Sequence, residues 1–486
     1  MEDEIKISTV KNLGYNSFGK ILVYAFSGIS SIILARNLSA SDYGVMGFAN
    51  IFISFLARFA DLGINNAIIQ KYKADDKTLY TGFSIRAFSG VVVFLIAISL
   101  SPLSKKFFDN PAVSNVIIVL SLNFIISTFS FLPNCVLTRE INYRKLLLPQ
   151  IVPAIISSFV SIVLALNGFK YWSVVIAQVL SAIASAVFTN AARPIKIMFK
   201  FDKHVAQELI YFGGNIFLSG ILIFIIFNAD NFIIGTSKGS KELGYYAIAF
   251  NWGSLVCTLI SSGIHTVLFP TMSRFQNNKL HLKKIYLKSL EHISFIAVFA
   301  NIALLILARE FLFFILGHST DKWMPALTVF QILCFYGIIR SILEPVGNIV
   351  LASGKSNILL KSTVFAGIIE LTFLYPALFF FDIEGVAVLI TVTYSLQYLI
   401  YFPLLKNEME INISDFISAI KPALLCMGIV LSICLLTFKF VATPSINSLI
   451  MKLLFIICFY FILYGYLSNW ALYKEYKIML RNFTSI

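Results

Sequence analysis

The sequence carries little charge for its length. Only 13% of its 486 residues are Asp, Glu, Lys or Arg, whereas 58% are hydrophobic and 15% are aromatic. A soluble domain of this size needs many more polar side chains to cover its surface. Its longest polar loop, near residues 271–288, is too short to fold alone. The expected solvent of this chain is therefore the lipid bilayer.

Familiar enzyme motifs are also missing. The chain contains no Walker A, HExxH or GxSxG motif, and its six cysteines form neither a CxxC nor a CxxH pair. Because the cysteines lie in or beside apolar runs, we expect them to pack as small apolar side chains and to bind no metal. The sequence thus predicts a protein that is not an enzyme and needs no cofactor. Its energy would come from an ion gradient or a substrate gradient.

Long apolar runs are what the sequence has in abundance. Runs of roughly 18–25 residues recur from one end to the other, which predicts an all-α polytopic membrane protein with about fourteen transmembrane helices. The predicted spans lie near residues 15–36, 43–66, 79–103, 114–138, 149–167, 171–191, 211–235, 243–267, 289–312, 325–351, 357–380, 384–405, 416–440 and 449–470.

The net charge of +14 is distributed unevenly between the two sides of these spans. Most lysines and arginines fall in segments that would be cytoplasmic if the N-terminus is cytoplasmic, which is the bias of the positive-inside rule. Both termini are therefore predicted to be cytoplasmic. The basic loops at 193–204 and 274–288 are expected to contact anionic membrane lipids, and we expect no nucleic acid partner.

The chain resembles itself when it is shifted by 200 residues. The segment ASDYGVMGFAN (40–50) then lies on SKELGYYAIAF (240–250), and further on NCVLT (134–138) matches NIVLA (348–352) at an offset of 214. Because each copy holds an even number of spans, the copies would insert the same way up. We predict a six-helix bundle at 1–200, a second at 201–410, and two additional helices with a tail at 411–486.

Polar side chains form matching stripes in the two copies. Residues spaced three or four apart lie on one face of a helix. One stripe lies in the second span and its counterpart in the eighth, and the members that we assign to a shared cavity are Ser54, Arg58, Asp61, Asn65, Ser254, Thr258 and His265. Such stripes either join neighbouring helices or line a hydrated cavity between the two copies.

Charged residues inside apolar spans are costly and indicate function. The basic ones predict binding of an anion, for which phosphate is well suited; they are Lys20, Arg58, Arg86 and Arg340. The acidic ones are either their partners or an ion-coupling site, and they are Asp61, Asp230, Glu344 and Glu370. The spacings Arg58–Asp61 and Arg340–Glu344 also allow two structural ion pairs.

Four segments, in this order and spacing, resemble the polysaccharide transporter family of the multidrug/oligosaccharidyl-lipid/polysaccharide flippase superfamily. The segments are ILARNLSASDYGVMGFANIFISFLARFADLGINNAIIQ (33–70), LTREINYRKLLLPQIVPAIISSFVSIVLALNGFKYWSVVIAQ (137–178), FNADNFIIG (227–235) with KELGYYAIAFN (241–251), and VLASGKSNILL (350–360). The resemblance covers roughly residues 8–405.

The resemblance implies a V-shaped pair of six-helix bundles that alternate between inward-open and outward-open states. Members move undecaprenyl-diphosphate-linked oligosaccharides across the bacterial cytoplasmic membrane for O-antigen, capsule or exopolysaccharide synthesis. It also implies coupling to Na⁺ or H⁺, and polysaccharide polymerase and chain-length machinery as partners. In this chain the basic and acidic residues within the spans nearly balance, whereas the family resemblance implies a strongly basic cavity.

Alternative functions make different predictions. A lipid II flippase or a cation-coupled drug antiporter would use the same architecture, but drug antiport predicts an acidic cavity. A membrane glycosyltransferase or polymerase predicts a sizeable loop with catalytic carboxylates, which the sequence lacks. An assembly scaffold predicts that substitution of the intramembrane charges leaves polysaccharide output intact.

Overall fold

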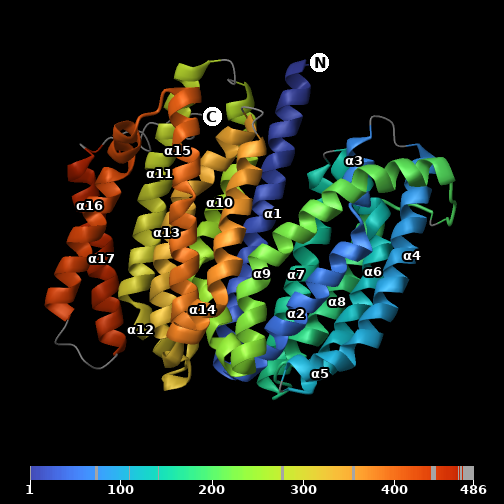
Figure 1. Ribbon diagram of the computed structural model, residues 1–486, viewed down its shortest axis with the longest axis horizontal. Helices are drawn as coiled ribbons and strands as arrows, with labels where there is room; N and C mark the ends of the chain where they lie inside the picture. The colour runs from blue at the N-terminus through green and yellow to red at the C-terminus, as the bar shows by residue number, and fades with distance from the viewer. Residues whose placement is uncertain are drawn as a thin grey trace. The chain divides into compact units, whose positions relative to one another are not determined.

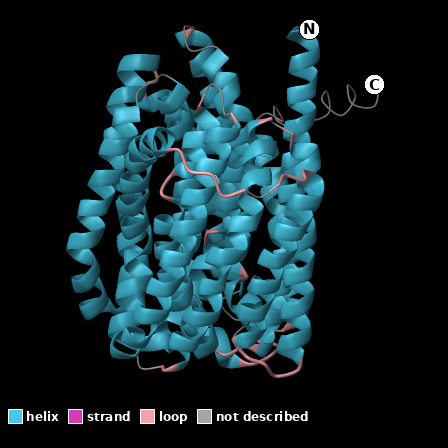
Figure 2. Cartoon of the chain, turned by 90° about the vertical axis from the view of Figure 1, so that its right-hand side faces the viewer, coloured by secondary structure: helices cyan, strands magenta, loops and turns pink. Residues whose placement is uncertain are grey.

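The computed structural model describes residues 2–71, 75–108, 110–140, 142–196, 198–274, 278–352, 356–438, 445–468, 470 and 473. Every regular element in these ranges is a helix, as Figure 2 shows. Within the described part of the chain, twelve stretches are long and apolar enough to cross a membrane. The chain is therefore a multi-pass helical membrane protein. It forms two compact units, Met1–Ala247 and Ile248–Ile486, while the predicted repeat boundaries at 200 and 410 stay a prediction.

The first unit consists of eight helices and most of a ninth. They are α1 (Glu2–Asn37), α2 (Ala40–Asp61), α3 (Ile64–Gln70), α4 (Asp76–Leu100), α5 (Ser104–Phe107), α6 (Ala112–Arg139), α7 (Tyr143–Leu166), α8 (Trp172–Ala192) and α9 (Lys203–Gly253), with a 3-10 turn at Ser101–Leu103. Helix α2 packs against α4 and α6, and α7 packs against α1 and α8 (Figure 1).

Polar caps fix where two of these helices begin. The Ser39 side chain accepts a hydrogen bond from the backbone N–H of Asp42, and Asp42 accepts one from the backbone of Ser39, so that α2 begins with a capping box. At α4, the Asp75 carboxylate accepts hydrogen bonds from the side chain and backbone of Thr78, at 2.6 and 3.0 Å. These hydrogen bonds lower the pKa of Asp75. This acid in the loop before α4 is therefore a helix cap.

The second unit contains the remaining helices. They are α10 (Leu255–Arg274), α11 (Lys279–Ile306), α12 (Ala308–Glu310), α13 (Leu327–Ala352), α14 (Ser356–Leu396), α15 (Tyr398–Met409), α16 (Ile413–Phe438) and α17 (Ile446–Leu467), with a π-helical turn at Phe311–Leu316 and a 3-10 turn at Asp321–Ala326. Helix α13 packs against α10, α11 and α14, and α16 packs against α11 and α17 (Figure 1).

Two of the helices contain a point where the backbone is not helical. In α9 this point is Gly239, with φ of 85°, and in α14 it is Phe381 and Asp382. A straight helix of 51 residues would span roughly 75 Å, well beyond the ~30 Å hydrocarbon core. The chain instead reverses at Gly239. The two arms of α9 lie close together, since the Tyr246 hydroxyl donates a hydrogen bond to Asp230 at 2.8 Å.

The predicted span at 43–66 is also interrupted. Helix α2 ends at Asp61, and Leu62 and Gly63 both adopt left-handed backbone angles, with φ of 49° and 70°. Helix α3 follows in a new direction and is held by an apolar core that includes Ile64, Ile68 and Phe83. Broken helices at membrane depth persist only where protein or a hydrated cavity covers the freed backbone groups.

Candidate functional site

The break between α2 and α3 lies in backbone contact with α9. A Cβ atom on Gly63 would approach the Gly213 carbonyl oxygen to 2.4 Å, and a Cβ on Gly213 would approach the Leu62 carbonyl oxygen to 2.5 Å. Both positions therefore need glycine, and Gly63 needs it a second time for its positive φ. This close approach fixes the end of α2 against the first part of α9.

A cavity of about 370 Å³ lies beside this break. Its walls come from the last turns of α2, from the beginning of α3 and from α9. The lining residues are Ser54, Ala57, Arg58, Asp61, Gly63, Asn66, Ile216, Phe217 and Gly220. The cavity therefore combines an arginine, an acid, an amide and a hydroxyl within one open space next to an apolar helix.

Arg58 is the basic side chain of this cavity. It is exposed, and its Nη1 lies 3.8 Å from where a Cβ on residue 220 would be, so Gly220 leaves room for the guanidinium. Aromatic rings continue the wall, since Phe59 packs edge-to-face on Phe217 with centroids 5.1 Å apart. A guanidinium beside an apolar wall binds phosphate or carboxylate oxygens more strongly than one in water.

Arg86, on α4, is committed to the protein backbone behind the cavity. Its guanidinium donates to the Ala60 carbonyl at 2.9 Å and to the Ser127 hydroxyl oxygen at 3.0 Å. Ser89 donates to the same carbonyl at 2.6 Å. The last carbonyls of a helix lack helical partners and favour a cation, so Arg86 stabilises the end of α2. It also interacts electrostatically with Asp61.

Asn66 rather than Asn65 lines the cavity. The sequence prediction continued the polar stripe of α2 through residue 65 by helical spacing. The two left-handed residues between the helices change the phase of α3, so the next residue faces the cavity. The glycine at 63, within an apolar span and two residues after an aspartate, is the sequence signal for such a helix end.

Two further predicted residues of the first unit lie elsewhere. Lys20 is half-buried on α1, next to Gly19, where α1 meets Gln150 of α7. Asp230 is buried and accepts hydrogen bonds from Tyr246 at 2.8 Å and from Asn231 at 3.0 Å. The Asp230 carboxylate therefore joins the two arms of α9.

A second polar cluster surrounds Arg340 in the second unit. Its guanidinium donates to the Tyr336 hydroxyl at 2.6 Å and lies 5.7 and 5.6 Å from the ring centroids of Tyr336 and Tyr394. These two rings meet edge-to-face at 5.0 Å. Two cation–π contacts and a hydrogen bond hold the charge of Arg340 in an aromatic cage.

Other predicted residues of the second unit surround this cluster or lie at the junction of α9 and α10. Glu344 is half-buried one turn beyond Arg340, and Glu370 is buried on α14. Ser254 donates to the Phe250 carbonyl at 2.6 Å, and Thr258 donates to the Ser254 carbonyl at 3.0 Å. The side chain of His265 lies outside the described residues.

A buried ion pair was not anticipated from the sequence. Lys452 of α17 donates to Glu310 of α12, and Ser448 donates to the same carboxylate at 3.2 Å. The Glu310 and Lys452 side chains are only 3% and 10% exposed. The predicted fourteenth span includes Lys452, and a lone lysine in an apolar helix could have indicated a buried partner.

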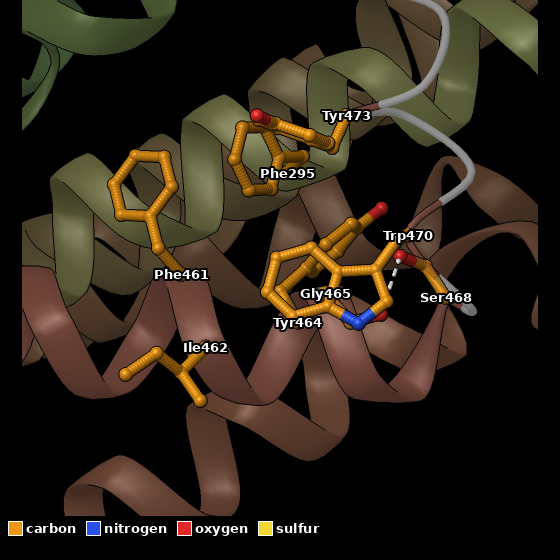
Figure 3. Close-up of a pocket in the computed structure, with 8 residues that line it drawn as sticks. All are labelled: Phe295, Phe461, Ile462, Tyr464, Gly465, Ser468, Trp470 and Tyr473. Carbon is orange, nitrogen blue, oxygen red and sulfur yellow. Dashed lines mark hydrogen bonds between the residues drawn. The ribbon is translucent and has the colours of Figure 1, made fainter.

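An aromatic pocket of about 360 Å³ lies between α11 and the end of α17 (Figure 3). Phe295 and Phe461 form one side, and the Trp470 ring covers Gly465, where a Cβ would lie 2.7 Å from the indole. None of the described residues that line it is charged. This pocket therefore suits an apolar group and not an anion.

The chain is similar in sequence to known proteins. The family model described as polysaccharide biosynthesis protein matches residues 33–327. An uncharacterized membrane protein in the cps region of Klebsiella pneumoniae is 26% identical over 85% of this chain and 86% of its own length. The lipopolysaccharide biosynthesis protein WzxC of Escherichia coli K12 is 22% identical over 74% of this chain and 73% of its length.

A solved structure is similar in fold. The lipid II flippase MurJ, in an inward closed conformation, superposes with a TM-score of 0.77 at 14% identity and covers 95% of this chain and 99% of its own. At that identity the likeness concerns the fold alone. It agrees with the all-helical, multi-pass architecture described above.

Proposed function

Because the chain belongs to the polysaccharide biosynthesis protein family, we propose that it is a flippase for a lipid-linked oligosaccharide. It would move an undecaprenyl-diphosphate-linked repeat unit across the cytoplasmic membrane by alternating access, for surface polysaccharide synthesis. The names of its relatives, lipopolysaccharide biosynthesis protein WzxC and succinoglycan biosynthesis transport protein ExoT, support this class of substrate. The role is transport rather than catalysis.

The observation that carries the proposal is the Arg58 cavity. A lipid-linked sugar presents a diphosphate between its apolar tail and its polar glycan, and the diphosphate is the part that resists entry into lipid. Arg58, Asn66 and Ser54 supply donors within one cavity, and Phe217 supplies an apolar wall. Donors of this kind bind phosphate oxygens in a partly dry site.

Packing in the first unit supports the proposed repeat. A Cβ on Gly44 would come within 1.7 Å of the Ser240 carbonyl oxygen, and one on Gly244 within 1.8 Å of the Ala40 carbonyl oxygen. Residues 40 and 44 correspond to 240 and 244 under the 200-residue shift, so the contact is reciprocal. A two-fold axis between two like motifs produces such reciprocity, as two copies inserted in the same direction require.

The count of crossings fits the same proposal. Two of the twelve candidate stretches, Lys203–Gly253 and Asn357–Asn407, are each 51 residues long and each contain a non-helical point. Reading each as two crossings gives fourteen and places both termini on the same side. We infer that this side is cytoplasmic, from the distribution of lysine and arginine.

Several parts of the proposal extend beyond the cavity itself. Coupling to Na⁺ or H⁺ through Asp61, Asp230, Glu344 or Glu370 is one of them. Contacts with polysaccharide polymerase and chain-length machinery are another. Lys20 and Arg340 are proposed to contact the glycan or its phosphates at other stages of transport.

Translocation in proteoliposomes tests the proposed function. With a fluorescent undecaprenyl-diphosphate oligosaccharide, Arg58→Ala is expected to reduce transfer at least about tenfold, because a charge-assisted bond to phosphate is lost. Arg193→Ala is the matched control, since Arg193 forms an exposed ion pair with Glu140 at 3.0 Å. Unchanged transfer by Arg58→Ala would refute the proposal, and selective transfer of lipid II would favour the lipid II flippase instead.

A further inference from the structure

We infer that Arg86 is a positioning residue, which neutralises Asp61 from behind the cavity and thereby leaves the Arg58 guanidinium available to an anion. This inference rests on the proposed function and changes the role that the sequence predicted for Arg86. That prediction placed Arg86 among the side chains that bind substrate.

The donors of the Arg86 guanidinium are already engaged in hydrogen bonds within the protein. One guanidinium nitrogen bonds to the Ala60 carbonyl and another to Ser127, at 2.9 and 3.0 Å. The set of residues lining the cavity includes Arg58 and Asp61 but not Arg86. An anion in the cavity would therefore meet Arg58 first, and Arg86 could reach it only by leaving the end of α2.

The negative charge of Asp61 also bears on the role of Arg86. This carboxylate lines the same cavity as Arg58, one helical turn away, and would compete with an anion for that guanidinium. Arg86 acts on this carboxylate electrostatically, from the place where its guanidinium binds the carbonyl of the preceding residue, Ala60. Asp61 also accepts a hydrogen bond from the Gly63 backbone N–H. Part of the charge of Asp61 is thus offset by groups other than Arg58.

The position of Arg86 at the end of α2 supports the same role. Asp61 is the last residue of α2, and the Ala60 carbonyl that Arg86 binds directly precedes it. Arg86 therefore fixes the helix end and balances the acid with the same group. This balance explains how nearly equal numbers of basic and acidic residues within the spans are compatible with a cavity that presents the Arg58 guanidinium to an anion.

Binding of inorganic pyrophosphate to the purified protein in nanodiscs, measured by calorimetry, tests the inference. Arg86→Gln is expected to weaken binding by about tenfold, because Asp61 then acts on Arg58 without a counter-charge. Adding Asp61→Asn to Arg86→Gln is expected to return the affinity to within about threefold of the parent. The Asp61→Asn single variant is the reference, because loss of that carboxylate by itself favours an anion. In that background Arg86→Gln is expected to change the affinity less than about threefold, whereas loss of a residue that bound pyrophosphate directly would cost about tenfold in either background.

Thermal unfolding of each variant separates loss of fold from loss of binding. If Arg86→Gln does not fold, the double variant decides alone: near-parental affinity supports the inference, and a tenfold loss in a folded protein overturns it. Failure of both variants to fold would also overturn it, because Arg86 would then act only on stability. Two outcomes would refute the proposed function, and the inference with it. One is that the parent protein does not bind pyrophosphate, and the other is that Arg58→Gln still binds it.

Discussion

At the scale of single residues, neighbouring polar side chains have different surroundings. Arg58 and Asn66 line the cavity, whereas Arg86 caps a helix and Asp230 joins the two arms of α9. Burial of a charge in a membrane protein requires partners, and the partners show which charges are already engaged. We propose that Arg58 is the charge of the first unit that meets a ligand, because it lines the cavity.

Asn65 and Asn66 provide a matched pair of substitutions. Asn66→Asp places a carboxylate in the cavity beside Arg58 and is expected to reduce translocation of the lipid-linked oligosaccharide by about tenfold or more. Asn65→Asp adds the same charge outside the lining of that cavity and is expected to cost less than about threefold. The proteoliposome assay measures both, and equal losses would contradict the assignment of Asn66.

At the scale of elements, the position of α2 depends on glycine contacts. Gly213 and Gly214 are neighbours on α9, but only Gly213 faces the α2–α3 break. A Cβ on Gly213 would lie 2.5 Å from the Leu62 carbonyl oxygen, while one on Gly214 would have nothing within 4 Å. Helix–helix contacts through small residues are common in membranes because they let backbones approach closely.

Gly213→Ala is therefore expected to destabilise the first unit by about 1–3 kcal/mol, through overpacking against backbone atoms that cannot move aside. Gly214→Ala is expected to be neutral or slightly stabilising, since alanine favours the helix more than glycine does. Thermal unfolding in detergent compares the two variants. A larger loss for Gly214→Ala would show that the α2–α3 break does not contact α9 as described.

The attachment of α17 depends on the Glu310–Lys452 pair. Lys452→Met is expected to destabilise the second unit by about 3–5 kcal/mol, because it leaves the Glu310 carboxylate buried and unpaired. Combining it with Glu310→Gln is expected to recover most of that loss, since no charge then remains buried. Thermal unfolding of the single and double variants is the measurement, and a double variant no more stable than Lys452→Met would contradict an ion-pair role.

At the scale of the whole molecule, the segments 40–50 and 240–250, which match under the 200-residue shift, meet at their N-terminal ends. Ser41 and Ser240 bring their hydroxyl oxygens to 3.1 Å, next to the reciprocal glycine contacts. Such a meeting of equivalent segments from distant parts of the sequence is a tertiary property of the chain. It indicates where an axis between the copies would pass.

The pair Ser41→Cys and Ser240→Cys is expected to form a disulfide on mild oxidation, because side chains in contact satisfy the short Cβ separation that the bond needs. Either single variant serves as the control. Five of the six native cysteines are buried and Cys458 is exposed. A shift in gel mobility after proteolysis between the two positions measures the bond, and its absence would contradict the reciprocal contact.

Topology is tested by labelling. With cytoplasmic termini, a cysteine introduced at His318 is expected to react with a membrane-impermeant maleimide in intact cells. One introduced at Arg193 is expected to react only after permeabilisation. The parent protein controls for labelling at Cys458. The opposite pattern would reverse the proposed orientation and with it the direction of transport.

The sequence by itself determined the class of protein, an all-helical chain that crosses a membrane several times. Hydropathy and periodic spacing are local properties, so runs of apolar residues and polar stripes such as Ser54–Arg58–Asp61 can be read from neighbouring residues alone. The match of Gly44 with Gly244 under the 200-residue shift can be read from the sequence for the same reason, whereas their reciprocal contact cannot. Family resemblance then pointed to the substrate class.

Only the tertiary structure decided which polar groups face a cavity and which are engaged elsewhere. The left-handed residues Leu62 and Gly63 changed the phase of α3, which no helical spacing anticipates. Arg86 is 26 residues from Ala60, and Lys452 is 142 residues from Glu310. Such partners are chosen by the packing of distant helices, because a charge in lipid accepts whichever counter-charge the fold brings near it.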